Sequence, residues 1–504
     1  MSKLSKNIIY NLFGQGLVLV IGFVAVKYIF HRLGGEVLGI IYFISTLNTV
    51  LAAVLEMGIT STTVREVSGH FESDKNYTKD LIQTFSFFYW SIYFLASLII
   101  FFLAPFFVAK WIHLDTINPA TAITIIRILG IAAITVLPSS LYASLIRGLQ
   151  RMEFINLIEV VTLGLQQFGV FLILILGGGL FPVVYWFALI YIFRVIIYLF
   201  FSAHFFSFSA LIPKFSFYVI KRNLKFVLQT SLISIFAAIH TQTDKLIISK
   251  LLPIGILGYY SFAYSSVSKG LLLSDAISGA AYPSFSALYK TGQKDDLISQ
   301  YHKLQDLVCF GLLPIFAFIP FISLPLFSYL FNKEIAHLLL LPIAFLSLGF
   351  YMNGTVTIPY RFSLAAGKPE ITAKMNFYAL FIVLPATAIL IHFFGLSGAG
   401  FSWVFYNIFG YFYAIPRMCK ECLGIKARDW YFHIFKIFIL AILTFGLGWT
   451  SIALRGSYSL FSLMLAYLIA LIFFLFFSYF LIGNEFRNTL LYYLKLFKIK
   501  FIKA

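Results

Sequence analysis

Residues 376–416 read NFYALFIVLPATAILIHFFGLSGAGFSWVFYNIFGYFYAIP and contain no Lys, Arg, Asp or Glu. A helix needs about 20 apolar residues to cross the hydrocarbon core of a bilayer, so this run is long enough for two crossings. The segment Gly395-Leu396-Ser397-Gly398 supplies a break, because glycine and serine favour turns. We therefore expect two membrane-spanning helices joined by a short turn.

The whole chain has the composition of a membrane protein. Its 504 residues are 61% hydrophobic, 19% aromatic and 11% charged, with a mean hydropathy of +0.93. Soluble proteins carry about 25% charged residues, which excludes a soluble enzyme. The fold class we predict is an all-α polytopic membrane protein with about fourteen spans. The charge-free or nearly charge-free runs that define them are Asn7–Val26, Val37–Leu55, Leu81–Ala109, Ile128–Ile146, the two parts of Val160–Phe193, Phe226–Thr243, Leu257–Tyr282, Leu307–Asn332, Ile335–Tyr360, the two parts of Asn376–Pro416, Ile437–Leu454 and Gly456–Asn484.

The positive charge agrees with this count. A net charge of +18 in a soluble protein would suggest nucleic acid as a partner, but cytoplasmic loops of membrane proteins carry excess Lys and Arg. With alternating spans and a cytoplasmic N-terminus, few of the 37 Lys and Arg residues fall in outside segments: Arg32, Lys110, Lys250, Lys333 and Arg455. We therefore expect both termini in the cytoplasm and no nucleic-acid partner.

The segments between spans are too short for a catalytic domain. Gly177–Phe181 and Gly395–Gly398 are turns, and the longest soluble stretches, Ser61–Asp80 and Phe205–Lys225, are expected to be cytoplasmic loops. Three cysteines make no disulfide framework, and no nucleotide-binding signature occurs. We predict that the protein is not an enzyme and has no catalytic residue, metal or cofactor. Coupling to an H⁺ or Na⁺ gradient is an open alternative.

Two motifs recur at one offset. Residues 33–39 (LGGEVLG) resemble 252–258 (LPIGILG), and 147–153 (RGLQRME) resemble the region around 366–370 (AGKPE). Both Gly39 to Gly258 and Gly148 to Gly367 span 219 residues. An even number of spans separates the copies, so the repeats are parallel, an arrangement typical of transporters. We expect a lobe at residues 1–210, a second at 211–430, and two further helices with a basic tail at 431–504, with a central cavity between the lobes.

These motifs and the fourteen-span topology resemble the polysaccharide transport family of oligosaccharide flippases. They look most like the Wzx-type O-antigen or capsule flippases, relatives of MATE exporters and MurJ-like lipid II flippases in the MOP superfamily. The resemblance implies movement of an undecaprenyl-pyrophosphate-linked oligosaccharide from the inner to the outer leaflet of a bacterial inner membrane, by alternating access. It also implies membrane lipids and polysaccharide polymerase or ligase machinery as partners.

Charged residues within spans are costly and therefore candidates for function. Eight occur: Glu56, Arg127, Glu159, Arg194, Asp244, Lys245, Lys269 and Asp275. A pyrophosphate needs cationic donors, so the predicted cavity cations are Lys269, Arg127, Arg194 and Lys245. Glu56 and Glu159 are expected to be structural.

Other polar residues suggest ion coupling or a polar cavity face. His240 and Asp244 lie four residues apart on one helix face and could relay protons, and Asp275 is a third candidate. A structural polar stripe explains His240 and Asp244 equally well. Asp244 and Lys245 point about 100° apart on a helix, so we do not expect them to pair simply. Asn11 and Gln15 form either a cavity face or a close-packed helix seam.

The last two spans could form a groove for a lipid tail, as in lipid-carrying relatives, or pack beside a lobe.

Three functions compete at this stage. A MATE-type cation-coupled multidrug exporter is the alternative to the flippase, but export of organic cations predicts an acidic cavity. A membrane glycosyltransferase, polymerase or ligase would need a sizeable outer loop with catalytic groups.

Overall fold

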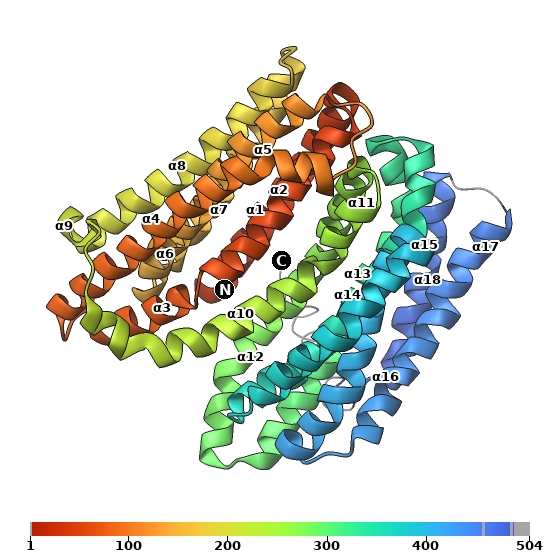
Figure 1. Ribbon diagram of the computed structural model, residues 1–504. Helices are drawn as coiled ribbons and strands as arrows, with labels where there is room; N and C mark the ends of the chain where they lie inside the picture. Colours follow the sequence, from red (N-terminus) through yellow and green to blue (C-terminus); the bar gives the residue numbers. More distant parts are fainter. Residues whose placement is uncertain (1–2, 456–458, 484–486, 488–504) are drawn as a thin grey trace, which may run out of the picture. The chain divides into compact units, whose positions relative to one another are not determined.

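The computed structural model describes residues 3–455, 459–483 and 487, and no strand occurs in that part of the chain (Figure 1). The helices of the first half are α1 (Lys3–Leu33), α2 (Gly35–Leu55), α3 (Ile59–His70), α4 (Lys75–Phe106), η1 (Phe107–Trp111), α5 (Pro119–Ala133), α6 (Val136–Gly148), α7 (Met152–Ile175), α8 (Leu180–Phe206), α9 (Phe208–Leu211) and α10 (Phe217–Leu251). Those of the second half are α11 (Ile254–Ser268), η2 (Lys269–Leu271), α12 (Leu272–Thr291), α13 (Lys294–Leu330), α14 (Lys333–Ala365), α15 (Glu370–Met418), η3 (Cys419–Leu423), α16 (Ala427–Ala441), η4 (Ile442–Gly446), α17 (Leu447–Arg455) and α18 (Leu460–Leu481).

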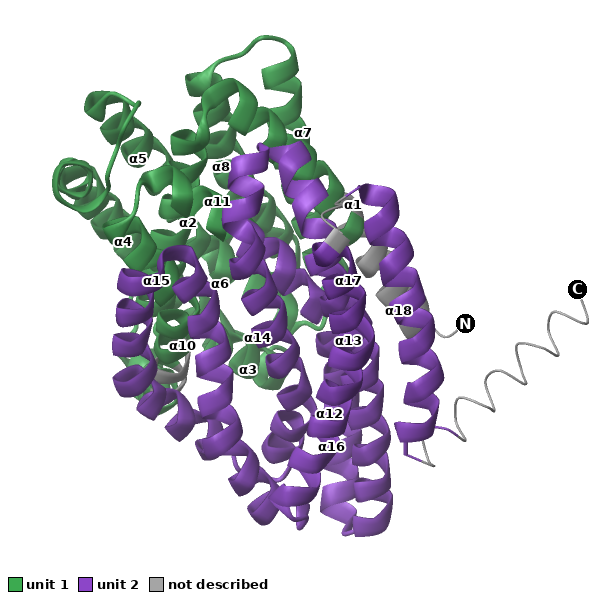
Figure 2. Cartoon of the chain, turned by 90° about the vertical axis from the view of Figure 1, so that its right-hand side faces the viewer, with its two compact units in different colours: residues 1–262 green, residues 263–504 purple. Residues whose placement is uncertain are grey.

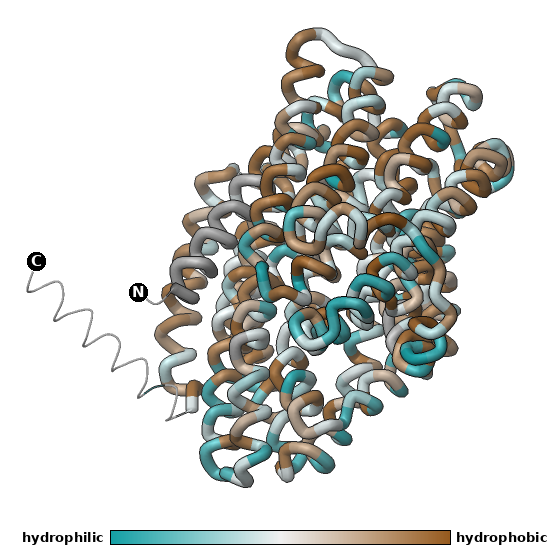
Figure 3. The backbone as a smooth tube through the Cα atoms, turned by 90° about the vertical axis from the view of Figure 1, so that its left-hand side faces the viewer, coloured by the Kyte–Doolittle hydropathy of each residue, from teal (hydrophilic) through white to brown (hydrophobic). Residues whose placement is uncertain are grey.

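The fold class is confirmed. Within the described residues, ten helical segments are long and apolar enough to cross a membrane. Hydrophobic stretches recur throughout the chain, interspersed with hydrophilic ones (Figure 3). The count of fourteen is not confirmed by this criterion. One of the ten segments, Glu370–Leu423, contains a sharp kink and therefore two helical stretches.

Glycines end the helices where the sequence predicts breaks. Inside α15, Gly395 has φ 56° and ψ −132°, which interrupts the helical geometry at the expected turn. Gly177, with φ 82°, lies between the end of α7 and the start of α8. Both conformations are open to glycine because it has no Cβ. These two predictions are confirmed.

Two local predictions are wrong. Ser61–Asp80 is mostly helical rather than a loop, because α3 covers Ile59–His70 and α4 begins at Lys75. Asp74 caps α4 by accepting a hydrogen bond from the Tyr77 backbone N–H at 2.9 Å. The expected single helix Leu257–Tyr282 is instead interrupted by the 3₁₀ turn η2.

Contacts divide the chain into two compact units, Met1–Phe262 and Ala263–Ala504 (Figure 2). The core of unit 1 is built from α3, α4, α6 and α8, with Leu81, Phe85, Leu141 and Tyr198 fully or almost fully buried. In unit 2, α13 packs on α14 and α14 on α15. The three-part division at residues 210 and 430 stays a prediction.

The two copies of the repeated glycine motif lie against each other in unit 1. A Cβ added to Gly39 would lie 2.0 Å from the Ile254 carbonyl oxygen, and one added to Gly258 would lie 2.7 Å from the Gly39 nitrogen. The start of α2 therefore meets the start of α11 backbone to backbone. Beside this contact, the buried Glu36 carboxylate accepts backbone N–H bonds from residues 115–117.

Candidate functional site

A polar cavity of about 260 Å³ opens among α12, α14 and α15 of unit 2. Most of its lining side chains carry a polar or charged group: Asp275, Asn353, Thr357, Tyr360, Arg361, Thr372, Tyr406 and Asn407. The remaining lining residues are Val356, Met375, Gly410, Ala414 and Met418.

Helical spacing places these groups on common faces. Asn353, Thr357 and Arg361 follow one another at intervals of four on α14, so their side chains project from one side of that helix. On α15, Asn407 is followed at three, seven and eleven residues by small or flexible residues that leave room for the cavity. Polar residues at intervals of four within a span are a sequence signal for a polar helix face, and charge-free runs alone do not show it.

Hydrogen bonds orient part of the lining. The Asn353 amide donates to Asn407 Oδ1 at 3.2 Å, and the Asn407 amide donates to the Trp403 carbonyl at 2.7 Å. Tyr406 Oη donates to Asn376 Oδ1 at 2.9 Å. The buried hydroxyl of Thr372 has no hydrogen-bond partner. A buried polar atom without a partner costs about 1–3 kcal/mol.

Opposite charges line the cavity together. Asp275 is exposed at its edge, and the half-buried Arg361 donates from Nε to Ser278 Oγ at 3.5 Å. Asp275 and Arg361 are close enough to interact electrostatically. Asp275 was predicted for ion coupling, and that role stays a prediction. Arg361 lies in the last two turns of α14.

A larger and mostly apolar groove of about 1110 Å³ runs between α18 and the continuous segment α16–η4–α17. Its walls come from aliphatic and aromatic side chains such as Leu443, Leu465 and Phe473, with Gly448 at a close approach. Lys436 is its one lysine or arginine among the described lining residues. The predicted alternatives for these helices were a lipid groove and simple packing, and both stay predictions.

Two of the predicted cavity cations are engaged in ion pairs. Arg194 on α8 contacts Glu159 on α7 at 2.5 Å, and Tyr198 donates to the same carboxylate at 2.7 Å. Lys245 Nζ lies 3.5 Å from Asp244 Oδ1 and donates to the Thr241 carbonyl at 2.7 Å.

The expectation that Asp244 and Lys245 do not pair is wrong. Both are buried, and the lysine side chain is long enough to fold back along the helix to its neighbour. Tyr260 donates to the other Asp244 oxygen at 2.7 Å, so the carboxylate is shared between α10 and α11.

The other predicted residues are scattered. Arg127 on α5 stacks 4.2 Å above the Phe101 ring of α4 and donates to the Phe101 carbonyl. Lys269 is exposed at the start of η2, and His240 is half-buried one turn before Asp244. The side chains of Asn11 and Gln15 lie outside the described residues. The cation-binding, ion-coupling and cavity-face roles of all these residues stay predictions.

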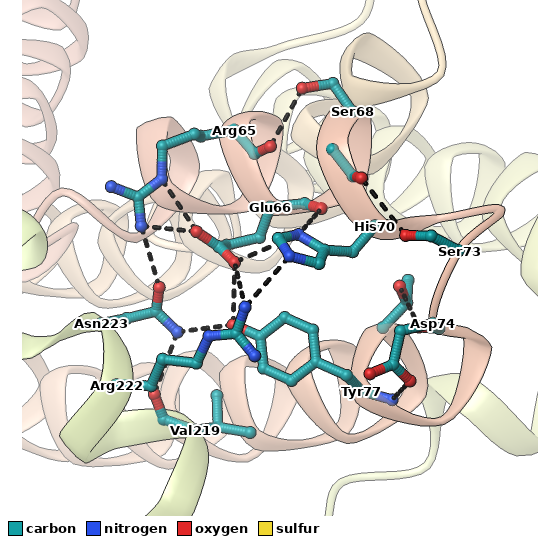
Figure 4. A network of polar contacts seen from close by, with 12 residues as sticks. Arg65, Glu66, Ser68, His70, Ser73, Asp74, Tyr77, Val219, Arg222 and Asn223 are labelled. Atoms are coloured by element: carbon teal, nitrogen blue, oxygen red, sulfur yellow. Dashed lines mark hydrogen bonds and ion pairs between the residues drawn. The ribbon is translucent and has the colours of Figure 1, made fainter.

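A charge cluster that the charge-free runs do not indicate surrounds the buried Glu66, where α3, α4 and α10 meet (Figure 4). Glu66 is 6% exposed and accepts bonds from Arg65 at 2.8 Å and from Tyr77 Oη at 2.9 Å. Arg222 and Asn223 on α10 join it: Arg222 Nη2 lies 4.0 Å from Glu66, and Asn223 donates to Tyr77 at 2.9 Å. The cluster ties the start of α10 to α3 and α4.

Comparison with known proteins adds to this geometry. A profile of the family described as "Polysaccharide biosynthesis protein" matches residues 33–337. The chain belongs to this family. The expected resemblance is thereby confirmed, and the protein is a membrane protein of polysaccharide biosynthesis.

One sequence relative and two solved structures resemble this chain over most of its length. A Shigella flexneri protein named "Putative O-antigen transporter" is 21% identical over 408 residues, covering 79% of this chain and 93% of that one. Among solved structures, the lipid II flippase MurJ in an inward closed conformation has a TM-score of 0.70 at 16% identity, covering 93% and 98% of the two chains. An inward-facing MATE transporter of the MOP superfamily has a TM-score of 0.66 at 16% identity, covering 80% and 95%. These two likenesses concern the fold.

Proposed function

We propose that this chain is a flippase that moves an undecaprenyl-pyrophosphate-linked oligosaccharide from the inner to the outer leaflet of the bacterial inner membrane. Transport proceeds by alternating access, with both termini in the cytoplasm. The observation that carries the proposal is the apolar groove between α16–η4–α17 and α18. Family membership and the name of the Shigella relative support the same substrate class.

The groove suits an isoprenoid tail for a reason of shape. A lipid tail already lies in hydrocarbon, so entering an apolar groove yields no hydrophobic gain, and association depends on packing. Most of the side chains that line the groove are apolar, and the two helices lie near each other at Gly448. It would thus hold the tail beside the protein while the polar head group crosses.

The pyrophosphate requires cationic partners, for which Lys269 is the strongest of the four predicted residues. It is exposed, whereas Arg194 and Lys245 are already held by carboxylates. The Arg127 guanidinium stacks on the Phe101 ring. The fold likeness to a MATE transporter keeps the multidrug exporter as the competing function, and the assay below separates the two.

Coupling to H⁺ or Na⁺ belongs to the same proposal. His240, Asp244 and Asp275 are its candidate residues, and no nucleotide is required. A polymerase or ligase would receive the glycan after it reaches the outer leaflet.

The direct test uses proteoliposomes that contain lipid-linked oligosaccharide from the producing strain. Lectin binding from outside reports the fraction of glycan on the outer leaflet with time. We expect protein-dependent exchange between leaflets. Its absence, together with protein-dependent efflux of cationic dyes, would replace the flippase with the exporter.

A matched pair of variants tests the groove. Ser451→Phe adds a ring where Ser451 lines the groove, and Leu454→Phe alters a residue of the same helix that is 89% exposed. We expect slower transfer only with Ser451→Phe. Equal rates for both would show that the groove does not hold the substrate.

A further inference from the structure

We propose that the polar cavity among α12, α14 and α15 is a subsite for one neutral sugar residue of the transported glycan. The inference rests on the proposed function and assigns to this cavity the recognition of the head group, as distinct from the groove that would hold the tail.

The charges of the cavity favour an uncharged ligand. Asp275 and Arg361 line the same cavity and carry opposite charges. A lone anion would meet the carboxylate, and a lone cation would meet the guanidinium, so neither ion finds a site of single sign. A polyhydroxylated ring is different, because each hydroxyl both donates and accepts. It can donate to Asp275 and accept from Arg361 at the same time.

The remaining polar groups are of the type that sugars use. Asn353 and Asn407 each present an amide with donors and an acceptor. Their mutual bond uses one donor of Asn353 and one lone pair of the Asn407 oxygen, which leaves further capacity at both. The Thr357 hydroxyl also lines the cavity; it donates to the Asn353 carbonyl at 3.4 Å and can still accept a hydrogen bond.

An aromatic surface completes the site. Tyr406 lines the cavity, and its ring stacks on Trp403 with centroids 5.2 Å apart and planes 15° apart. The apolar C–H face of a sugar ring packs well against such a rigid aromatic pair. The volume of about 260 Å³ equals several waters at about 30 Å³ each, which is space for one sugar ring.

Saturation-transfer NMR on the full chain in nanodiscs tests the proposal with a panel of methyl glycosides: hexoses, 6-deoxyhexoses and N-acetylhexosamines. We expect at least one glycoside to bind the wild type, and Asn407→Leu and Thr357→Val to weaken it by about tenfold, the loss expected for a missing buried hydrogen bond. Asn48→Leu, the same change on α2 of unit 1, serves as control and should bind as wild type. Asn48 Oδ1 has no hydrogen-bond partner to lose.

The outcomes separate this inference from the flippase. If no glycoside binds, or if binding survives in both cavity variants, the sugar subsite is overturned even when lipid-linked glycan still changes leaflet. If glycosides bind in the expected manner but no glycan changes leaflet, the flippase is overturned and the sugar site stands. If one cavity variant melts below the wild type, its loss of binding does not count, and the result of the other variant decides. The two changes lie on different helices.

Discussion

At the scale of single residues, buried charge in this protein is mostly paired charge. The buried Glu66 and Asp244 and the half-buried Glu159 each contact a cation and also accept a hydrogen bond from a tyrosine hydroxyl. Desolvating a charge is expensive, and both a counter-ion and extra hydrogen bonds are needed to offset the cost. The same logic makes removal of one member costly, which yields two predictions.

Glu66→Gln should lower stability by about 1–3 kcal/mol, because the amide no longer balances Arg65 and Arg222 and leaves a buried polar group poorly matched. The measurement is the melting temperature in detergent, followed by tryptophan fluorescence. Glu153→Gln is the control, since Glu153 is more than half exposed and its contact with Arg151 is 3.4 Å long. Exposed pairs contribute little, so its melting temperature should stay that of wild type. Equal melting for both variants would contradict the structural role of the cluster.

Glu159→Gln and Arg194→Gln should each destabilise by about 1–3 kcal/mol, between the values for exposed and buried pairs, because the partners are only 33% and 27% exposed. The double variant should regain part of the loss, since no uncompensated charge is left. Strictly additive losses in melting temperature would mean that the two residues do not act as a pair. A stable double variant that fails to transport would return Arg194 to the substrate-binding candidates.

At the scale of elements, the decisive contact is the one between α2 and α11. Glycine at both positions lets two helix backbones approach more closely than any side chain would permit. The two copies of one repeated motif therefore make this contact with each other.

Gly39→Ala should destabilise the protein by about 1–3 kcal/mol, because its Cβ would collide with the Ile254 carbonyl and the backbones must separate. Gly22→Ala is the control, since no atom lies within 4 Å of a Cβ there. Alanine in a helix is favoured over glycine, so this control should melt at or slightly above wild type. Thermal unfolding of the two variants side by side checks the prediction, and a Gly39→Ala protein as stable as wild type would refute the contact.

At the scale of the whole molecule, the testable property is orientation in the membrane. The asymmetry of Lys and Arg predicts that the segment between α4 and α5 faces outward and the turn between α12 and α13 faces the cytoplasm. Single cysteines report this in a variant whose Cys309, Cys419 and Cys422 are replaced.

Thr116→Cys should react with a membrane-impermeant maleimide in right-side-out vesicles, and Gln293→Cys should react in inverted ones. Both native residues are exposed. Labelling both from the same side would show that the number of spans between them is miscounted. The reversed pattern would invert the predicted orientation and with it the direction of the proposed transport.

The sequence alone was sufficient for the membrane class, the helical breaks at Gly177 and Gly395, and the family. These properties are local or additive, since each residue contributes its own transfer free energy and each glycine its own turn preference. The helix Ile59–His70 was not predicted, because a segment rich in polar residues was interpreted as a loop between two charge-free runs.

The tertiary structure alone decided which polar groups meet. The Glu159–Arg194 pair joins residues 35 apart in sequence, and the Asn353–Asn407 bond joins residues 54 apart. The sequence shows that a span contains a charged residue. The rotation of each helix about its axis decides whether that side chain contacts a partner, lines a cavity or faces lipid. That rotation is set by side-chain packing between helices. The polar cavity and the apolar groove are therefore properties of packing.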